Sequence, residues 1–201
     1  MKTIVVATNN FNKFKQISIA LAALKDKYIF KSLREIRYKK PIAETGTTFE
    51  ENSLIKARQV AKDTNCITIA DDSGIEIDAM DKEPGVYAAR FAQKFNGAQS
   101  CLTYILEKLQ NAPESARTAR FHAVISLVFP SGEHTTFDGV LEGKIGHEII
   151  KAGHGLTYDP IFIPNGYDKP LSVLTSEERV AINHRGIALR KLLKYIEDNP
   201  L

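Results

Sequence analysis

The sequence predicts an α/β protein with an elongated mixed β-sheet, flanking helices and two lobes around a central cleft. The chain opens with a buried strand at residues 3–8, a helical stretch and a second strand near residues 28–30. A capped helix then leads into a strand that begins at Ile67. Two long β segments, at residues 120–129 and 133–141, flank a Pro-Ser-Gly turn and predict an antiparallel hairpin. The sheet is therefore expected to be mixed rather than purely parallel.

The flanking helices are predicted from apolar spacing and from capping residues. The first helix should carry four apolar residues at helical spacing: Phe14, Ile17, Leu21 and Leu24. The second helix should begin at Thr47 or Thr48, with Glu50 or Glu51 closing a capping box. Three further helices are expected, at residues 98–109, after a capping box of Thr175 and Glu178, and at residues 185–196.

Composition favours a single folded domain over residues 1–201. The chain is 43% hydrophobic and 25% charged, and its length can bury roughly 70% of its unfolded surface. A net charge of +3 is too small to indicate nucleic-acid binding by itself. No apolar run approaches the roughly 20 residues that span a bilayer, and no signal peptide is recognised, so we expect a cytoplasmic protein without a membrane partner. Cys66 and Cys101 lack metal-ligand spacing and are expected to stay thiols.

Several charged residues have a plain surface interpretation. Basic residues concentrate at residues 31–40, which contain Lys31, Arg34, Arg37, Lys39 and Lys40. Such runs usually form a solvated face, and a rim that attracts polyphosphate is the alternative. Taken alone, Glu44 fits a surface turn and Lys56 fits a solvated position on a helix.

Two adjacent carboxylates follow the alternating apolar residues that begin at Ile67. Asp71 and Asp72 precede Ser73 and Gly74, and a tight turn between two strands would contain the same residue types. Adjacent like charges repel unless a positive charge lies beside them, and Mg²⁺ binds carboxylate and phosphate oxygens. We therefore expect the strand to end at the carboxylates, in a turn that can also be a metal site.

Two other polar clusters indicate an anionic ligand. The loop of residues 8–13 lies between a strand and a helix, where backbone N–H groups and the helix terminus can bind anionic oxygens and Lys13 adds a charge. The loop lacks the glycines of a P-loop, and a polar helix cap with an exposed lysine is the alternative. His184 and Arg185 begin the last helix. A cation is unfavourable beside the positive end of the helix dipole, so this position indicates contact with a ligand; a surface or capping pair is the alternative. With the carboxylates, these clusters indicate a triphosphate site.

The ordered set of motifs resembles the inosine triphosphate pyrophosphatase family over nearly the whole chain. The motifs are Thr8-Asn9-Asn10-Phe11-Asn12-Lys13, Glu44-Thr45-Gly46-Thr47-Thr48-Phe49-Glu50-Glu51-Asn52, Lys56-Ala57, Ala70-Asp71-Asp72-Ser73-Gly74, Pro84-Gly85-Val86-Tyr87, Arg120-Phe121, Tyr158-Asp159-Pro160-Ile161-Phe162 and His184-Arg185-Gly186. The resemblance implies hydrolysis of the deaminated purine nucleoside triphosphates ITP, dITP and XTP to the nucleoside monophosphate and pyrophosphate, which cleanses the nucleotide pool. It also implies Mg²⁺ as cofactor, a nucleotide-binding cleft and a homodimer.

The resemblance further implies roles for individual residues. Glu44 and Asp72 would bind the metal, and Asp72 would also take a proton from the attacking water. Lys13 and Lys56 would act as catalytic residues that neutralise the triphosphate. The residues implied to bind the substrate are Thr8, Asn9, Asn10, Phe11, Asn12, Lys13, Ser73, Leu156, Thr157, Tyr158, Asp159, Arg179, His184 and Arg185, the last two near the base.

The chain departs from the family pattern at two places. Leu156 and Thr157 stand where the family usually has Phe-Gly, so no aromatic ring is expected there to stack on the base. Arg179 stands where bacterial members commonly carry a lysine, which replaces a point donor by a planar fork. A pyrophosphatase for other modified nucleotides stays open as an alternative, and so does a nucleotide-binding module without turnover.

Overall fold

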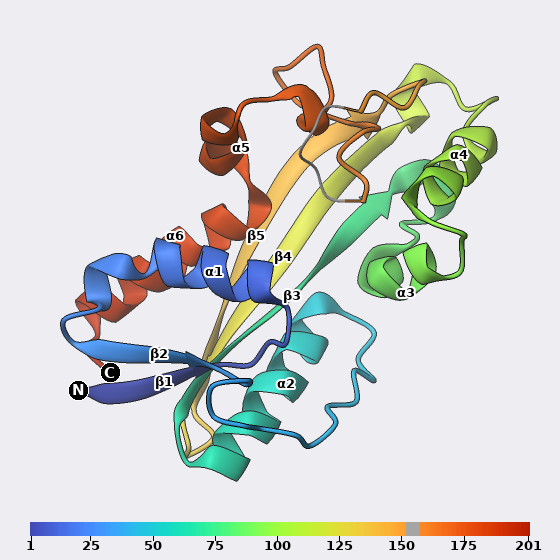
Figure 1. Cartoon of the computed structure of the whole chain (residues 1–201). Coiled ribbons are helices and arrows are strands. Elements are labelled where there is room, and N and C mark those ends of the chain that lie inside the picture. Colours follow the sequence, from blue (N-terminus) through green and yellow to red (C-terminus); the bar gives the residue numbers. More distant parts are fainter. Residues whose placement is uncertain (152–156) are drawn as a thin grey trace. The chain divides into compact units, whose positions relative to one another are not determined.

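The computed structural model describes residues 1–151 and 157–201 and contains a mixed six-stranded sheet with flanking helices (Figure 1). The order of the strands is β2-β1-β3-β4-β5-β6. The strands are β1 Lys2–Val6, β2 Tyr28–Ser32, β3 Ile67–Ile77, β4 Thr118–Val128, β5 His134–Ile145 and β6 Phe162–Pro164. The helices are α1 Phe11–Ala20, α2 Phe49–Thr64, α3 Ala88–Gln93, α4 Ala98–Lys108, α5 Ser176–Ile182 and α6 His184–Asp198. β1 pairs in parallel with β2 and β3, whereas β5 and β6 are antiparallel, so the predicted α/β class with a mixed sheet is confirmed.

The chain divides into two compact units, each assembled from separate stretches of sequence. Unit 1 contains Met1–Asp72, Ala123–Gly139 and Arg185–Leu201, and unit 2 contains Ser73–His122 and Val140–His184. The chain passes between the units within β3, β4, β5 and α6. A single domain over residues 1–201 with a cleft between two lobes stays a prediction.

Unit 1 has helices on both faces of its strands, because β1 divides its side chains between two apolar layers. Ile4 and Val6 belong to a buried cluster that includes residues of α1 and α6, such as Leu192. Val5, between them, belongs to a second cluster with residues of α2, such as Val60. Successive side chains of a strand point to opposite faces, so α1 and α6 cover one face and α2 covers the other (Figure 1).

Strand β3 does not end at the two carboxylates, so the predicted turn there is wrong. β3 runs unbroken from Ile67 to Ile77, and both Asp71 and Asp72 are buried within it. A buried carboxylate is costly unless it is paired, and each of these two is bound by lysine or arginine side chains from other parts of the chain. These ion pairs stabilise the two charged side chains inside β3. The strand can therefore continue where local residue types alone would favour a turn.

Both predicted capping boxes are present. Thr48 Oγ1 accepts the Glu51 N–H at 3.1 Å, and the Glu51 side chain accepts the Thr48 N–H at 3.2 Å. Thr175 and Glu178 form the equivalent pair at the start of α5, at 3.2 and 2.8 Å. The first strand ends at Val6, earlier than predicted. The chain turns there, because the Thr8 N–H donates to the Val6 carbonyl at 2.8 Å.

Unit 2 has a core of its own. Ile77 of β3, Phe121 of β4, Phe162 of β6 and Leu102 of α4 belong to one buried cluster. The rings of Phe121 and Phe162 are tilted against each other with centroids 4.7 Å apart. The strands β3, β4 and β5 each begin in one unit and end in the other. Each of these strands therefore contributes side chains to the core of both units.

The hairpin and the two thiols agree with the sequence-based predictions. β4 and β5 are neighbours in the sheet, and the turn between them is closed by a bond from Phe129 N to Glu133 O at 2.8 Å, as expected for the predicted hairpin. Cys66 and Cys101 are free thiols, as predicted. Within the described residues, no helix has the length and apolar character needed to cross a membrane.

Candidate functional site

The loop after β1 forms a helix cap, which was the alternative to an anion site. The side-chain oxygen of Asn10 accepts the N–H groups of Asn12 at 3.0 Å and of Lys13 at 3.2 Å. Thr8 Oγ1 in turn accepts the Asn10 N–H at 3.1 Å. Two backbone amides that were expected to receive an anion therefore have partners inside the loop, and the Lys13 side chain is the charged group that the loop presents.

Lys13 lies against Asp71, together with Arg185 of α6. Lys13 Nζ is 2.6 Å from Asp71 Oδ2, and Arg185 Nε donates to Asp71 Oδ1 at 2.9 Å. Arg185 also donates to Gln16 Oε1 of α1 at 2.8 Å. The Asp71 side chain is fully buried, which by itself would raise its pKa, but Arg185 and Lys13 outweigh burial and hold that pKa well below its usual range. Asp71 is thus a charged anchor between α1 and α6.

Lys56 of α2 binds two carboxylates from separate parts of unit 1. Its Nζ is 2.8 Å from Glu44 Oε1 and 2.6 Å from Asp72 Oδ1. Lys56 is only 8% exposed and Asp72 only 7%, so the interpretation of Lys56 as a solvated residue is wrong. Burial lowers the pKa of Lys56, but the two carboxylates outweigh it and raise that pKa above its usual value. The structure therefore gathers Glu44 and Asp72 at one ammonium group, as the motifs predict.

The loop that carries Glu44 is fixed to α2 through Gly46. Gly46 N donates to the side-chain oxygen of the fully buried Asn52 at 2.8 Å. A Cβ at Gly46 would lie 2.6 Å from Glu51 Cβ and 2.8 Å from Asn52 Oδ1, closer than packed atoms approach. Glycine therefore permits the contact that holds this loop, and with it Glu44, beside Lys56.

Asp72 differs from its neighbour in its second carboxylate oxygen. Asp72 Oδ2 is buried and has no hydrogen-bond partner among residues 1–151 and 157–201. Burial raises the pKa of Asp72 above its usual value; Lys56 opposes this shift, and the charge of Glu44 adds to it. A buried acceptor without a partner is costly, so this oxygen suits a proton, a water molecule or a cation.

The donor set at this cluster fits a hard divalent cation. Mg²⁺ is usually bound by one or two carboxylates together with water and substrate phosphates, and Glu44 and Asp72 are two such carboxylates within reach of one lysine. No group of three or more His, Cys, Asp and Glu side chains that could hold a metal occurs in the described part of the chain. The two carboxylates would therefore supply only part of the coordination shell.

Unit 2 holds two further side-chain pairs among the predicted residues. Arg179 NH2 is 2.9 Å from Asp159 Oδ2, and the Asp159 side chain is almost fully buried. The His184 ring stacks on Phe121, with centroids 5.1 Å apart and planes 14° apart. Both His184 and Asp159 are thus held in fixed orientations within this unit.

Tyr158 is a core residue of unit 2. Its hydroxyl donates to the carbonyl of Ala88 at 2.7 Å, and burial raises its pKa far above the usual value. The residues predicted for substrate binding that are exposed or half-buried are Thr8, Asn9, Asn10, Phe11, Asn12, Lys13, Ser73, Thr157 and Arg179. Leu156 lies outside the described residues. The binding roles of all these residues stay predictions.

Two residues of the cluster around Lys13 had no predicted role. Asp71 was a motif residue without an assignment, yet a signal existed: adjacent like charges repel unless a positive charge lies beside them, so Asp71 needs a cation as much as Asp72 does. Gln16 gave no such signal, because a single polar residue on a helix usually faces solvent.

Comparisons with known proteins agree with this fold. A model described as the Ham1 family matches residues 4–195. Two proteins named dITP/XTP pyrophosphatase are each 42% identical: that of Bacillus subtilis (strain 168), with 98% of both chains covered, and that of Leifsonia xyli subsp. xyli (strain CTCB07), with 96% of this chain and 94% of the relative covered. The solved structure of a HAM1 protein from Coxiella burnetii matches with a TM-score of 0.89 and 36% identity, over 98% of this chain and 100% of that chain. The chain belongs to the Ham1 family, and the family resemblance seen in its sequence motifs is confirmed.

Proposed function

We propose that the protein hydrolyses deaminated purine nucleoside triphosphates, namely ITP, dITP and XTP, to the nucleoside monophosphate and pyrophosphate. Relatives named dITP/XTP pyrophosphatase, 42% identical over nearly the whole chain, support this substrate class. The observation that carries the proposal is the cluster of Glu44, Lys56 and Asp72, in which a buried carboxylate oxygen has no partner in the described part of the chain. Such an oxygen is suited to act on water.

Asp72 is the proposed general base. Burial raises its pKa, and a base works best when its pKa approaches the working pH, because it is then both deprotonated and sufficiently basic. The proton of the attacking water would pass to Asp72 Oδ2. The resulting hydroxide attacks the α-phosphorus. The bond from this phosphorus to the oxygen that bridges it to the β-phosphorus breaks, and pyrophosphate leaves with the electron pair of that bond.

Two lysines are proposed to neutralise the triphosphate. Lys13 is held at one carboxylate oxygen of Asp71, and Lys56 is held between Glu44 and Asp72. Both ammonium groups are positioned by these ion pairs before a ligand binds. Preorganised cations stabilise developing charge on phosphoryl oxygens without further rearrangement.

We propose Mg²⁺ as the cofactor, with Glu44 and Asp72 as its protein ligands. When bound, Mg²⁺ supplies Lewis-acid stabilisation of the phosphoryl oxygens and orients the triphosphate. Lys56 keeps both carboxylates in position, since it bonds to one oxygen of each. Asp72 Oδ2, which lacks a partner among the described residues, is the oxygen best placed to serve water or metal.

His184 is the proposed donor to the purine base. Hypoxanthine and xanthine present an acceptor at the 6-position where adenine presents an amino donor, so a protein donor there selects against adenine. Arg185, the other predicted donor, already donates to Asp71 and Gln16. The His184 ring is stacked on Phe121, which fixes its plane.

A nucleotide panel tests the proposal. The protein is incubated with Mg²⁺ and ITP, dITP, XTP, ATP, GTP or modified pyrimidine triphosphates, and pyrophosphate and monophosphate are both measured. We expect the kcat/KM for dITP and XTP to exceed that for ATP by at least about 100-fold, because a mismatched donor pair leaves polar groups unsatisfied. Release of pyrophosphate from no triphosphate would favour a nucleotide-binding module without turnover.

A second candidate function is a pyrophosphatase for other modified nucleotides. It is favoured by Leu156 and Thr157, which replace the Phe-Gly pair that the family usually carries. Pyrophosphate release from the pyrimidine members of the panel, without release from dITP or XTP, would establish it. A homodimer is proposed on the family resemblance alone, and the cytoplasmic location expected from the sequence stays a proposal.

A further inference from the structure

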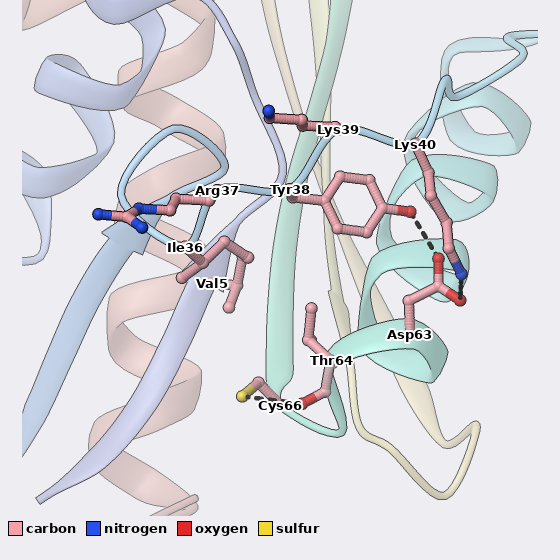
Figure 2. A pocket seen from close by; sticks show the side chains of 9 residues that line it. All are labelled: Val5, Ile36, Arg37, Tyr38, Lys39, Lys40, Asp63, Thr64 and Cys66. Carbon is pink, nitrogen blue, oxygen red and sulfur yellow. Dashed lines mark hydrogen bonds and ion pairs between the residues drawn. The ribbon is translucent and has the colours of Figure 1, made fainter.

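The basic run at residues 31–40 borders a pocket that takes no part in the proposed reaction. The pocket lies in unit 1 and has a volume of about 480 Å³, within the range of small-molecule sites. Figure 2 shows the side chains that line it, among them Ile36, Arg37, Tyr38, Lys39 and Cys66. The pocket shares no lining residue with the clusters around Lys13 and Lys56.

The charges that line this pocket do not balance. Asp63 is the one carboxylate among its lining residues, and both of its oxygens have partners: the Tyr38 hydroxyl at 2.7 Å and Lys40 Nζ at 2.8 Å. Arg37 and Lys39 form no ion pair within residues 1–151 and 157–201. Figure 2 shows both side chains extending away from Asp63. Two positive charges are therefore available to an anion at the rim.

The backbone at Arg37 is held in a conformation that arginine rarely adopts. Its φ angle is +54°, in the left-handed region. The turn is closed by bonds from Arg37 N to Arg34 O at 3.1 Å and from Tyr38 N to Leu33 O at 2.9 Å. Strained residues of this kind persist where the surrounding structure imposes them, and they concentrate at ligand sites. Here the strained turn immediately precedes Tyr38, and both Arg37 and Tyr38 line the pocket.

The other lining residues suit a flat ring. The Tyr38 hydroxyl is fixed by its bond to Asp63 and by a bond from Gln59 Nε2 at 2.9 Å, so the ring has a defined orientation. The partly buried Ile36 adds apolar surface nearby. Aromatic side chains bind flat rings by stacking, and arginine and lysine bind phosphate. The pocket therefore combines a surface for a ring with a rim for a phosphate.

We propose that this pocket binds a phosphorylated ring compound of nucleotide size, with its phosphate on Arg37 and Lys39 and its ring against Tyr38. The site binds without turnover and needs none of the residues proposed for hydrolysis. The basic run thus belongs to a ligand site rather than to a merely solvated face.

Cys66 provides a direct readout of occupancy. It lines the pocket and is partly exposed, whereas the other thiol, Cys101, is buried. The rate of Cys66 alkylation by iodoacetamide is measured by peptide mass spectrometry, with ADP as the probe and without Mg²⁺. The Lys13→Ala background weakens binding at the proposed catalytic cluster. We expect saturating ADP to slow alkylation at least about tenfold in this background, and adenosine or inorganic pyrophosphate to require higher concentrations because each makes only part of the contacts.

Charge-matched variants assign the binding to the pocket. Arg37→Asn with Lys39→Gln removes both rim charges, and asparagine tolerates the left-handed backbone. Lys25→Gln with Lys27→Gln removes two exposed lysines elsewhere in unit 1. We expect the first pair to raise the half-protecting ADP concentration at least about tenfold, the second pair to leave it unchanged, and both to keep the kcat of the enzyme.

Three results would overturn the proposal: no protection by ADP, equal protection in the two double variants, or protection that disappears with Lys13→Ala alone. If Cys66 reacts too slowly to follow, calorimetry of ADP binding to the Lys13→Ala protein replaces alkylation. A binding heat that the rim variant loses supports the site, and the absence of a binding heat overturns it.

Discussion

Asp71 and Asp72 are neighbours in β3, yet the two faces of this strand treat them differently. Asp71 is bound at both oxygens, by Lys13 and Arg185, and its pKa lies well below the usual range. Asp72 is bound at one oxygen by Lys56, its other oxygen has no partner in the described ranges, and its pKa is raised. The number of cations that bind each carboxylate therefore distinguishes the buried anchor Asp71 from Asp72, the proposed general base.

Asp72→Asn should produce the largest effect on activity. Losing a general base typically costs about 10²–10⁴-fold in rate, so we expect a fall of that size in kcat with dITP and Mg²⁺. Asparagine keeps the shape and cannot accept the proton. Circular dichroism of the variant serves as the folding control. A kcat equal to that of the wild-type protein would remove Asp72 from the mechanism.

Asp71→Asn should act mainly on stability. It leaves the buried Arg185 and the half-buried Lys13 without their counter-charge, and breaking a buried pair in this way costs about 3–5 kcal/mol of unfolding free energy, which denaturant titration measures. Gln16→Ala is the matched control, because it removes one neutral hydrogen-bond acceptor of Arg185, worth about 1 kcal/mol. Equal losses in the two variants would contradict the role of Asp71 as the anchor.

Lys13→Ala should act mainly on binding of the triphosphate. We expect KM for dITP to rise at least about tenfold, the effect of losing one charge-assisted hydrogen bond, with a smaller change in kcat. Lys15→Ala, at an exposed position of the same helix, is the control. An unchanged KM would show that Lys13 does not bind the triphosphate and, like Asp71, has a structural role.

Gly46→Ala should produce the smallest of these effects. The added Cβ meets Glu51 and Asn52 at less than 3 Å, and overpacking of this kind costs about 1–3 kcal/mol. The loop must shift, so Glu44 moves relative to Lys56 and activity falls with stability. Thr45→Ala, one residue earlier at an exposed position, should leave both unchanged. Full activity in Gly46→Ala would show that the position of Glu44 is not critical.

Local signals in the sequence predicted the elements that local interactions determine. The capping boxes of Thr48 with Glu51 and of Thr175 with Glu178 depend on residues three positions apart, and both are present. The buried strand predicted at residues 3–8 likewise follows from a short apolar run, and Ile4, Val5 and Val6 of β1 are buried. These features need no knowledge of distant contacts.

The failures come from contacts between residues distant in sequence. A turn was predicted after Asp71 because local residue types favour one, but the strand continues since Arg185, 114 positions away, neutralises that charge. Lys56 reads as solvated until Glu44 and Asp72 are known to meet it. The family motifs contain both carboxylates, but only the fold shows that Asp71 is bound at both oxygens and Asp72, the proposed base, at one.

The dependence of pyrophosphate release on Mg²⁺ is the most direct test of the site. We compare the wild-type protein, Glu44→Gln and the control Glu50→Gln, with dITP as substrate and Mg²⁺ varied. Loss of a residue that orients a metal ligand already weakens metal binding about 10–100-fold. Loss of the proposed ligand in Glu44→Gln should therefore raise the half-saturating Mg²⁺ concentration by at least that factor, and Glu50→Gln should leave it unchanged. The same half-saturating concentration in all three proteins, or hydrolysis that needs no Mg²⁺, would contradict a cation held by Glu44 and Asp72.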